Sequence, residues 1–229
     1  MSLFESAIGW LAPPQCLGCG IEGSTLCEMC IISEISPHGE RCGFCGRLSS
    51  TTCPRCRRAG APKHVWIVTD YEGIAQKLLQ VYKFNHLRTA SKEITAMLAE
   101  TLLYYNDRSE LDRINYLVVP VPTATTRRRK RGFGHAELLA AGTARSLKLD
   151  SHNALARLGQ TRQVGAKRAV RIAQQADNYL VRHPDKIKGR NILLIDDVVT
   201  TGATLRAVTK VLRQVGAKRV DALVFAKRL

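Results

Sequence analysis

Residues 192–204 read ILLIDDVVTTGAT, and this stretch decides the fold. Its first four residues are aliphatic, which is typical of a strand that is buried on both faces of a parallel sheet. Asp196 and Asp197 follow, and a loop of small residues then leads into residues 204–215, whose apolar spacing predicts a helix. A strand, a loop and a helix in this order predict an α/β fold with the loop at the carboxyl end of the strand.

The loop suits a phosphate group. It consists of Thr200, Thr201, Gly202, Ala203 and Thr204. Small residues before a helix present backbone N–H groups and hydroxyls to an anion, and the helix dipole favours negative charge there. The two preceding carboxylates can accept hydrogen bonds from a vicinal diol. Phosphate and diol together indicate a ribose 5-phosphate, whereas the absence of a following Gly-Lys-Ser/Thr excludes a Walker A loop.

Strands and helices alternate through most of the remaining chain. We predict strands at 65–71, 116–121, 191–195 and 220–225, and helices at 74–84, 89–105, 135–148 and 204–215. This alternation predicts a doubly wound parallel sheet. Residues 57–64, RRAGAPKH, are interpreted as a linker, so we expect two domains with separate cores, at 1–60 and 61–229.

All eight cysteines lie in the first 60 residues and form four C-x-x-C pairs: Cys16/Cys19, Cys27/Cys30, Cys42/Cys45 and Cys53/Cys56. The last four positions exceed the first four by 26 in every case, so one C-x2-C-x7-C-x2-C unit occurs twice. Each pair places two thiolates on one tight turn, and two such turns make a tetrahedral sulfur site suited to zinc. We therefore predict a small double zinc ribbon with two structural zinc ions.

Two questions about these cysteines stay open. A disulfide framework is the alternative to zinc, although the N-terminal residues MSLFESAIGWLAPPQ lack the basic region of a signal peptide, which argues against an oxidising compartment. The ligands can also be grouped sequentially, one site per repeat, or cross-braced, with Cys16/Cys19 joined to Cys42/Cys45. The perfect repeat favours the sequential grouping. His38 and His64 lie outside the repeat and are interpreted as surface residues.

The positive charge is concentrated in the second part of the chain. Residues 1–60 carry 5 basic and 5 acidic side chains, whereas residues 123–190 carry 16 and 4, which is +12 of a total of +16. This excess indicates a polyanionic partner, either nucleic acid or a phosphate-rich small molecule, with a solvated basic surface as the alternative. Five consecutive cations at 127–131 suit a mobile loop that a pyrophosphate or a nucleic-acid backbone would neutralise.

The composition excludes two further classes of protein. With 45% hydrophobic and 24% charged residues, the chain has the balance of a globular protein rather than a disordered one. Its apolar runs are shorter than the roughly 18 residues of a membrane span. We therefore expect a protein without a membrane span that stays in the cytoplasm.

The stretch 192–204 closely resembles the signature with which type I phosphoribosyltransferases bind 5-phosphoribosyl 1-pyrophosphate (PRPP). The resemblance implies that Asp196 and Asp197 hold the 2′- and 3′-hydroxyls of the ribose and that residues 200–204 cradle the 5-phosphate. It also implies Mg²⁺ bound together with PRPP, where it would bridge the pyrophosphate to protein and water.

The combination of this signature with the cysteine repeats resembles the ComF family of bacterial competence proteins, which includes the GntX proteins. Residues 118–140, VVPVPTATTRRRKRGFGHAELLA, are similar to the family's middle segment. Gly134 and His135 replace its usual Asn-Gln. The resemblance implies a pyrophosphate loop that contains Pro120, Val121, Pro122, Arg127, Arg128 and Arg131. Counterparts of a later family stretch are Arg157, Thr161, Gln163, Gly165 and Arg171.

The resemblance implies a protein that assists the uptake of single-stranded DNA in natural transformation, with a competence helicase or another DNA-processing protein as a partner. Two alternatives stay open: an active phosphoribosyltransferase with an unknown acceptor, and a regulator that senses PRPP without turning it over. An obvious hood for recognising a base is missing from the sequence, so catalysis is left open. The aromatic residues are scattered, so DNA binding is expected to be mainly electrostatic.

Overall fold

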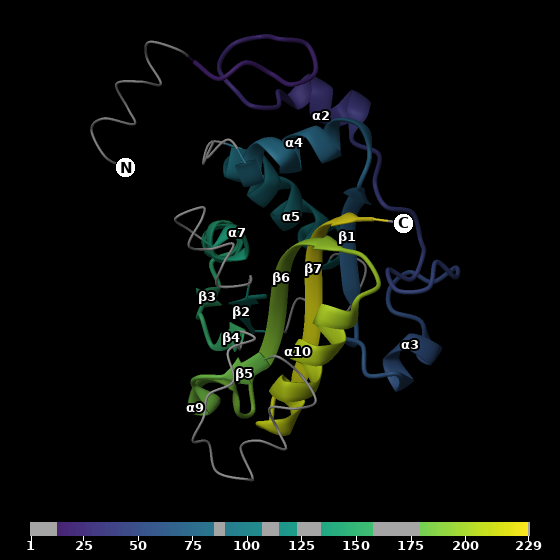
Figure 1. The fold of residues 1–229 in the computed structure, drawn as a ribbon, viewed down its shortest axis with the longest axis vertical. Helices are drawn as coiled ribbons and strands as arrows, with labels where there is room; N and C mark the ends of the chain where they lie inside the picture. Colours follow the sequence, from purple (N-terminus) through teal and green to yellow (C-terminus); the bar gives the residue numbers. More distant parts are fainter. Residues whose placement is uncertain (1–12, 85–89, 107–114, 123–133, 158–178, 229) are drawn as a thin grey trace, which may run out of the picture.

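The computed structural model describes residues 13–84, 90–106, 115–122, 134–157 and 179–228. Its centre is a sheet of five parallel strands in the order β1 (Val65–Asp70), β7 (Arg219–Lys227), β6 (Asn191–Val199), β2 (Tyr116–Pro120) and β3 (Asp150–Ser151). The predicted α/β fold with a parallel sheet is confirmed (Figure 1).

Helices cover both faces of the sheet. One face packs against α4 (Gly73–Phe84), α5 (Ala90–Asn106) and α7 (His135–Ser146). The other face packs against α10 (Ala203–Gln214) and against a small antiparallel pair, β4 (Leu155–Arg157) and β5 (Tyr179–Val181), which α9 (Pro184–Ile187) follows. The short elements β3, β4, β5 and α9 are not among the predicted ones, because runs of two to four residues carry no periodic signal.

The central strands are apolar on both sides, as parallel strands between two helix layers must be. Residues 192–195 of β6 and residues 222–226 of β7 have no measurable exposure. Strand β6 is longer than predicted. Its ladder with β7 continues past Ile195, pairing Asp196 with Val224 and Val198 with Ala226, so both acids lie inside the strand rather than after it.

A buried carboxylate ties the sheet together at the end opposite the Thr-rich loop. Asp221 is completely buried, and its Oδ2 accepts hydrogen bonds of 2.5 Å from the Tyr116 hydroxyl and of 2.5 Å from Arg219 Nε. Its Oδ1 accepts a hydrogen bond of 2.9 Å from the backbone N–H of His64. A buried charge is tolerated only with such partners. These bonds join β2, β7 and the chain entering β1.

The 26-residue sequence repeat is also a structural repeat. Antiparallel bridges join Gln15 to Glu22 and Arg41 to Leu48, at equivalent positions of the two units. Helix α2 (Glu28–Glu34) and helix α3 (Pro54–Arg58) also begin 26 residues apart. Each unit is therefore a small ribbon that ends in a short helix.

The first ribbon shares its buried residues with the α/β part, whereas the second ribbon has a small buried cluster of its own, made of Cys42, Cys53, Cys56 and Ala61. Cys16, Leu26 and Cys30 belong to the same buried cluster as Trp66 and Tyr82. The second ribbon packs on β1, because a Cβ atom built on Gly43 would lie 2.5 Å from Ile67 Cδ1. The predicted linker is also partly structured: Arg57 and Arg58 belong to α3, and Ala61 and Pro62 are buried. The boundary between residues 60 and 61 stays a prediction.

Candidate ribose-phosphate site and cysteine centres

The Thr-rich loop lies at the carboxyl end of β6 and starts α10. Gly202 is the residue before the helix and has the left-handed φ of +71°, which glycine adopts without a steric penalty. Thr200, Thr201 and Ala203 are exposed, and Thr204 is half-buried. The loop therefore presents a helix N-terminus, two exposed threonines and a glycine at one sheet edge, which is the arrangement that binds a phosphate.

The two acids occupy different electrostatic environments. Asp197 Oδ2 forms an ion pair of 2.8 Å with Nζ of Lys83, which α4 brings to the carboxyl end of the sheet. Asp196 Oδ1 accepts a hydrogen bond of 2.9 Å from the backbone N–H of Asp197. Burial and the neighbouring Asp197 carboxylate raise the pKa of Asp196 to about 8. Asp196 therefore carries a proton more readily than an ordinary carboxyl group, while Asp197 is held by a cation.

Helix α7 begins next to these acids. The Tyr82 hydroxyl donates a hydrogen bond of 2.6 Å to the carbonyl oxygen of His135, and the two rings stack edge to face with centroids 5.0 Å apart. Burial, followed by the Asp197 charge, raises the pKa of Tyr82. His135 is 1% exposed. The position at which the ComF pattern has a glutamine is thus a buried packing position in this chain.

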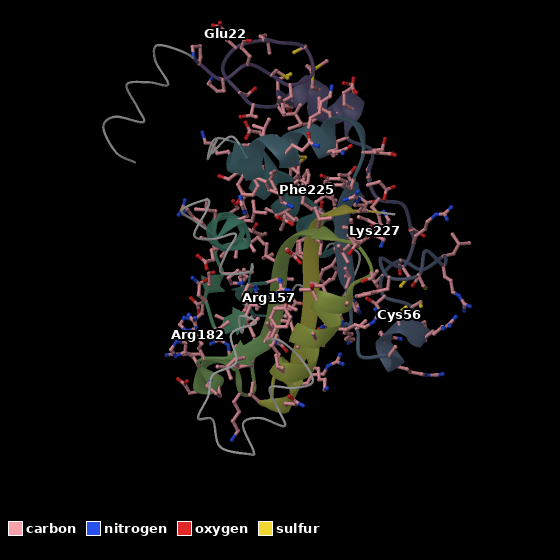
Figure 2. The ribbon with its side chains drawn as sticks, viewed as in Figure 1. Glu22, Cys56, Arg157, Arg182, Phe225 and Lys227 are labelled. Carbon is pink, nitrogen blue, oxygen red and sulfur yellow. The ribbon has the colours of Figure 1, made fainter. Side chains whose placement is uncertain are left out.

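Strand β7 supports the loop from the other side. Lys227 is the last residue of β7, and its Nζ donates a hydrogen bond to the carbonyl oxygen of Thr200. Burial lowers the pKa of Lys227. Figure 2 shows Lys227 at the carboxyl end of β7, beyond Phe225. A cation at this point adds positive charge next to the loop.

The second ribbon touches the Thr-rich loop. A Cβ atom built on Gly202 would lie 2.1 Å from Cε1 of Phe44, the residue between Gly43 and Cys45 in a C-x-x-C turn. The guanidinium of Arg206 lies 4.6 Å from the centroid of the Phe44 ring, and Arg206 Nη1 donates a hydrogen bond of 3.0 Å to the carbonyl oxygen of Thr201. Phe44 and Arg206 thus also hold the loop in place.

The predicted pyrophosphate loop is described only in part. Pro120 ends β2 opposite Ile195, and the backbone N–H of Val121 donates a hydrogen bond of 2.9 Å to the Ile195 carbonyl oxygen. Residues 120–122 therefore lie beside the strand that carries the acids. Several other predicted positions lie outside the described residues: Arg127, Arg128, Arg131, Thr161, Gln163, Gly165 and Arg171.

The cysteines form two sequential groups, so the cross-braced grouping is wrong. Within each group all four Sγ atoms lie within 4.8 Å of one another: Cys16, Cys19, Cys27 and Cys30, then Cys42, Cys45, Cys53 and Cys56. The Sγ atoms of Cys19 and Cys27 lie 3.7 Å apart and those of Cys45 and Cys53 lie 3.6 Å apart, far beyond the length of a disulfide bond. His38 and His64 belong to neither group. Both are half-buried, and His38 Nδ1 lies 2.7 Å from Asp70 Oδ1.

The chemistry of the groups fits a soft cation. Burial opposes ionisation of Cys16, but backbone N–H groups, that of Cys27 first, outweigh it and lower the pKa of Cys16 to about 6. In the second group, hydrogen bonding from the backbone of Cys56 lowers the pKa of Cys53 to about 7. Backbone N–H groups thus favour one thiolate in each group, and a four-sulfur set of this kind can hold a metal ion.

Sequence reasoning missed Lys83, Lys227, Phe44 and Arg206 as parts of the site. Lys83 and Arg206 are single cations within helical patterns, and Lys227 ends an apolar strand. No local motif marks any of the three. Phe44 does lie inside a C-x-x-C turn, but its contact with residue 202 depends on the packing of the ribbon on β1.

Comparison with known proteins agrees with this geometry. Residues 135–229 match the family model of the phosphoribosyl transferase domain. This part of the chain is therefore similar to a phosphoribosyl transferase domain. The domain model thus covers α7, β6, the Thr-rich loop, α10 and β7, which together carry most of the site.

Curated relatives extend the match to most of the chain. Competence protein ComFC of Bacillus subtilis is 28% identical over 199 residues, which are 78% of this chain and 73% of that protein. Competence protein F of Haemophilus influenzae is 25% identical, over 79% of this chain and 81% of that protein. DNA utilization protein YhgH of Escherichia coli (strain K12) is 24% identical, over 89% of this chain and 97% of that protein. The predicted resemblance to the ComF family is confirmed.

Solved structures show more distant likeness. Glutamine PRPP amidotransferase from B. subtilis is 20% identical with a TM-score of 0.40, over 58% of this chain and 25% of that chain. Hypoxanthine phosphoribosyl transferase from Trypanosoma cruzi is 15% identical with a TM-score of 0.36, over 58% of this chain and 64% of that chain. Likeness at this level carries no conclusion about a substrate. Among the described helices, none is long and apolar enough to cross a membrane.

Proposed function

We propose that this ComF-like protein binds PRPP, or a closely similar ribose phosphate, at the carboxyl end of β6 and handles single-stranded DNA in natural transformation. The observation that supports the ligand is the exposed Thr200–Thr204 loop, which starts α10 directly after two acids. The phosphate would bind the loop, and the diol would bind Asp196 and Asp197. The names of the relatives, which include competence and DNA utilization proteins, support the role with DNA.

The charged residues of the site would have different roles in binding the ligand. Lys83 and Lys227 would offset the negative charge of a bound phosphate ligand, and the raised pKa of Asp196 lets this group share a proton with a hydroxyl. Mg²⁺ bound with PRPP would neutralise the pyrophosphate beside residues 120–122. The two cysteine groups would each hold one structural zinc ion. The partner would be a competence helicase or another DNA-processing protein.

The test is a calorimetric titration of the full chain with PRPP and Mg²⁺. Above pH 8, where both Asp196 and Asp197 are carboxylates, wild type should bind PRPP, and the double variant Asp196→Asn/Asp197→Asn should bind it about tenfold or more weakly, because an amide accepts a hydrogen bond less strongly than a carboxylate by about 1 kcal/mol. The matched control is Asp150→Asn/Asp185→Asn, which makes the same change at two exposed positions. Its affinity should equal that of wild type.

Two results would contradict the proposal. If wild type shows no heat of binding with PRPP and none with ribose 5-phosphate, the site does not bind this class of ligand. If the site variant and the control variant bind PRPP equally, the ligand binds elsewhere. Binding of single-stranded DNA by wild type, measured by fluorescence anisotropy, tests the second part of the proposal separately.

A further inference from the structure

A groove of about 630 Å³ runs between α10 and the turn that follows α3. One wall is the exposed side of α10, with Arg206, Lys210 and Arg213, and the other wall is formed by Ala59 and Gly60. Ala203 lines its upper end, so the groove begins where the Thr-rich loop stops. Figure 1 shows α10 and α3 side by side along the edge of the molecule near β1.

The charge along this groove has one sign. Three of the eight lining residues are cations and none is an acid. On α10 the cations are spaced by four and three residues, so they share one face of the helix, and the sequence of α10 contains no acidic residue. Helix α3, which leads into the other wall, has the sequence PRCRR and no acid, and its arginines are exposed: Arg55, Arg57 and Arg58.

Arg206, Lys210 and Arg213 stand on one wall of the groove, and no acidic residue lines it to offset their charge, so the groove has a positive potential that an anion would neutralise. This groove is also held at a fixed width, because Arg213 Nη2 donates a hydrogen bond of 3.1 Å to the carbonyl oxygen of Ala61 and so ties α10 to the turn. Its shape and charge therefore favour an anionic ligand.

The dimensions favour a chain of phosphates. At about 1.5 Å per residue, the cations of α10 lie about 6 Å and 4.5 Å apart along the helix axis, which suits successive charges on one polymer. The lining residues between them are small, Ala203, Ala207, Ala59 and Gly60, so a backbone can approach closely. The volume is that of a small-ligand pocket, about 300–1,000 Å³, which one strand can enter but a duplex can only lie across.

We propose that this groove binds a single strand of nucleic acid through its phosphates, with the strand starting beside the ribose-phosphate loop. The inference rests on the proposed function for the presence of DNA and adds the surface that holds it. It differs from the sequence-based expectation, which assigned the polyanion to residues 123–190. The groove instead joins residues 59 and 60 to residues 203–214, whose proximity only the fold creates. With no aromatic residue in its lining, it should bind with little sequence selectivity.

The test compares two triple variants in binding a fluorescent oligo-dT over a range of salt concentrations. The groove variant is Arg57→Gln/Arg58→Gln/Lys210→Gln, which combines the lining residue Lys210 with the two exposed arginines of α3 that precede the wall at Ala59, and which spares the contact of Arg213 with Ala61. The control variant is Lys77→Gln/Lys92→Gln/Arg145→Gln, which removes the same charge from exposed positions on α4, α5 and α7, across the sheet. Each lost phosphate contact should lower the slope of log K against log salt by about 0.7, so three should lower it by about 2.

We expect the groove variant to lose that slope and about tenfold or more in affinity at low salt, while the control variant keeps the slope of wild type. PRPP titration should give wild-type affinity for both variants, which shows that the fold is intact. Equal losses in the two variants would overturn the groove, since net charge alone would then explain binding. The groove would also be overturned as a nucleic-acid site if polyglutamate or anionic vesicles bound as tightly as oligo-dT and their binding depended on the same three cations. If wild type binds no DNA, the proposed function fails first.

Discussion

Asp196 and Asp197 are neighbours in the sequence, yet they differ as chemical groups. Asp197 faces Lys83 at 2.8 Å, whereas Asp196 is half-buried beside the charge of Asp197. The two acids could be predicted from the sequence as a pair, because a strand ending in two carboxylates before a small-residue loop is a specific pattern. Their difference could not be predicted, because Lys83 reaches them from a helix more than 100 residues earlier in the chain.

The raised pKa of Asp196 predicts how stability depends on pH. The folded pKa of about 8 lies above the ordinary value of 3.8, so the folded state holds this proton more tightly than the unfolded state. The contribution of this group to stability is therefore complete below pH 3.8 and is lost as the pH rises toward 8. The free energy of unfolding of the Asp196→Asn variant should therefore rise relative to that of wild type as the pH rises. At pH 8 the difference should exceed about 1 kcal/mol. Urea denaturation at several pH values measures this, and a pH-independent difference would contradict it.

Gly202 predicts a second effect at this scale. Gly202→Ala should destabilise the protein by about 1–2 kcal/mol through its left-handed φ alone, and more because the new Cβ meets the Phe44 ring. Gly189→Ala is the matched control, since Gly189 has a φ of +73° and nothing within 4 Å of the added atom. In thermal unfolding, Gly202→Ala should lower the melting temperature more than Gly189→Ala does. When Phe44→Ala is also present, the two glycine substitutions should lower it equally. Equal losses at the two glycines would mean that Phe44 does not pack on the loop.

At the scale of elements, the second ribbon contacts the Thr-rich loop. Phe44 stands between two cysteines of the second group and packs on Gly202, whereas the first group packs against α4 and the main core. The cysteine repeat, the strands and the longer helices could all be predicted, because each has its own period or spacing. The contact between a C-x-x-C turn and a phosphate loop could not, because it depends on how Gly43 seats the ribbon on β1.

The repeat supplies a matched pair of variants for this coupling. Cys45→Ser and Cys19→Ser change equivalent exposed ligands of the two groups. Each should lower the zinc content from two ions per chain to one, measured by elemental analysis. Cys45→Ser should weaken PRPP binding several-fold more than Cys19→Ser, because only the second group holds Phe44 against the loop. If Cys19→Ser weakens PRPP binding as much, the coupling does not run through Phe44.

At the scale of the whole molecule, the ribbons and the α/β part share buried surface. Cys16, Leu26 and Cys30 lie in one apolar cluster with the sheet and its helices. The sequence suggested a linker because residues 57–64 are rich in arginine, alanine and glycine. The physical reason for the difference is that small residues serve equally well for close packing, as the buried Ala61 shows beside Cys42, Cys53 and Cys56.

This shared core predicts how the chain unfolds. Cys27→Ser should lower the melting temperature of the whole chain in one transition, because loss of the first metal site exposes part of the main core. Differential scanning calorimetry measures this. Two transitions, with the larger one at the wild-type temperature, would show instead that the first ribbon unfolds alone and that the boundary after residue 60 separates independent domains.

The central claim is that the loop at residues 200–204 and the acids before it hold a ribose 5-phosphate unit. A crystal structure of the full chain with PRPP and Mg²⁺ tests it most directly. We predict the 5-phosphate within about 2.7–3.2 Å of backbone N–H groups in the loop, with the ribose hydroxyls on Asp196 and Asp197. PRPP bound at any other place, or an empty loop at saturating PRPP, would contradict the claim.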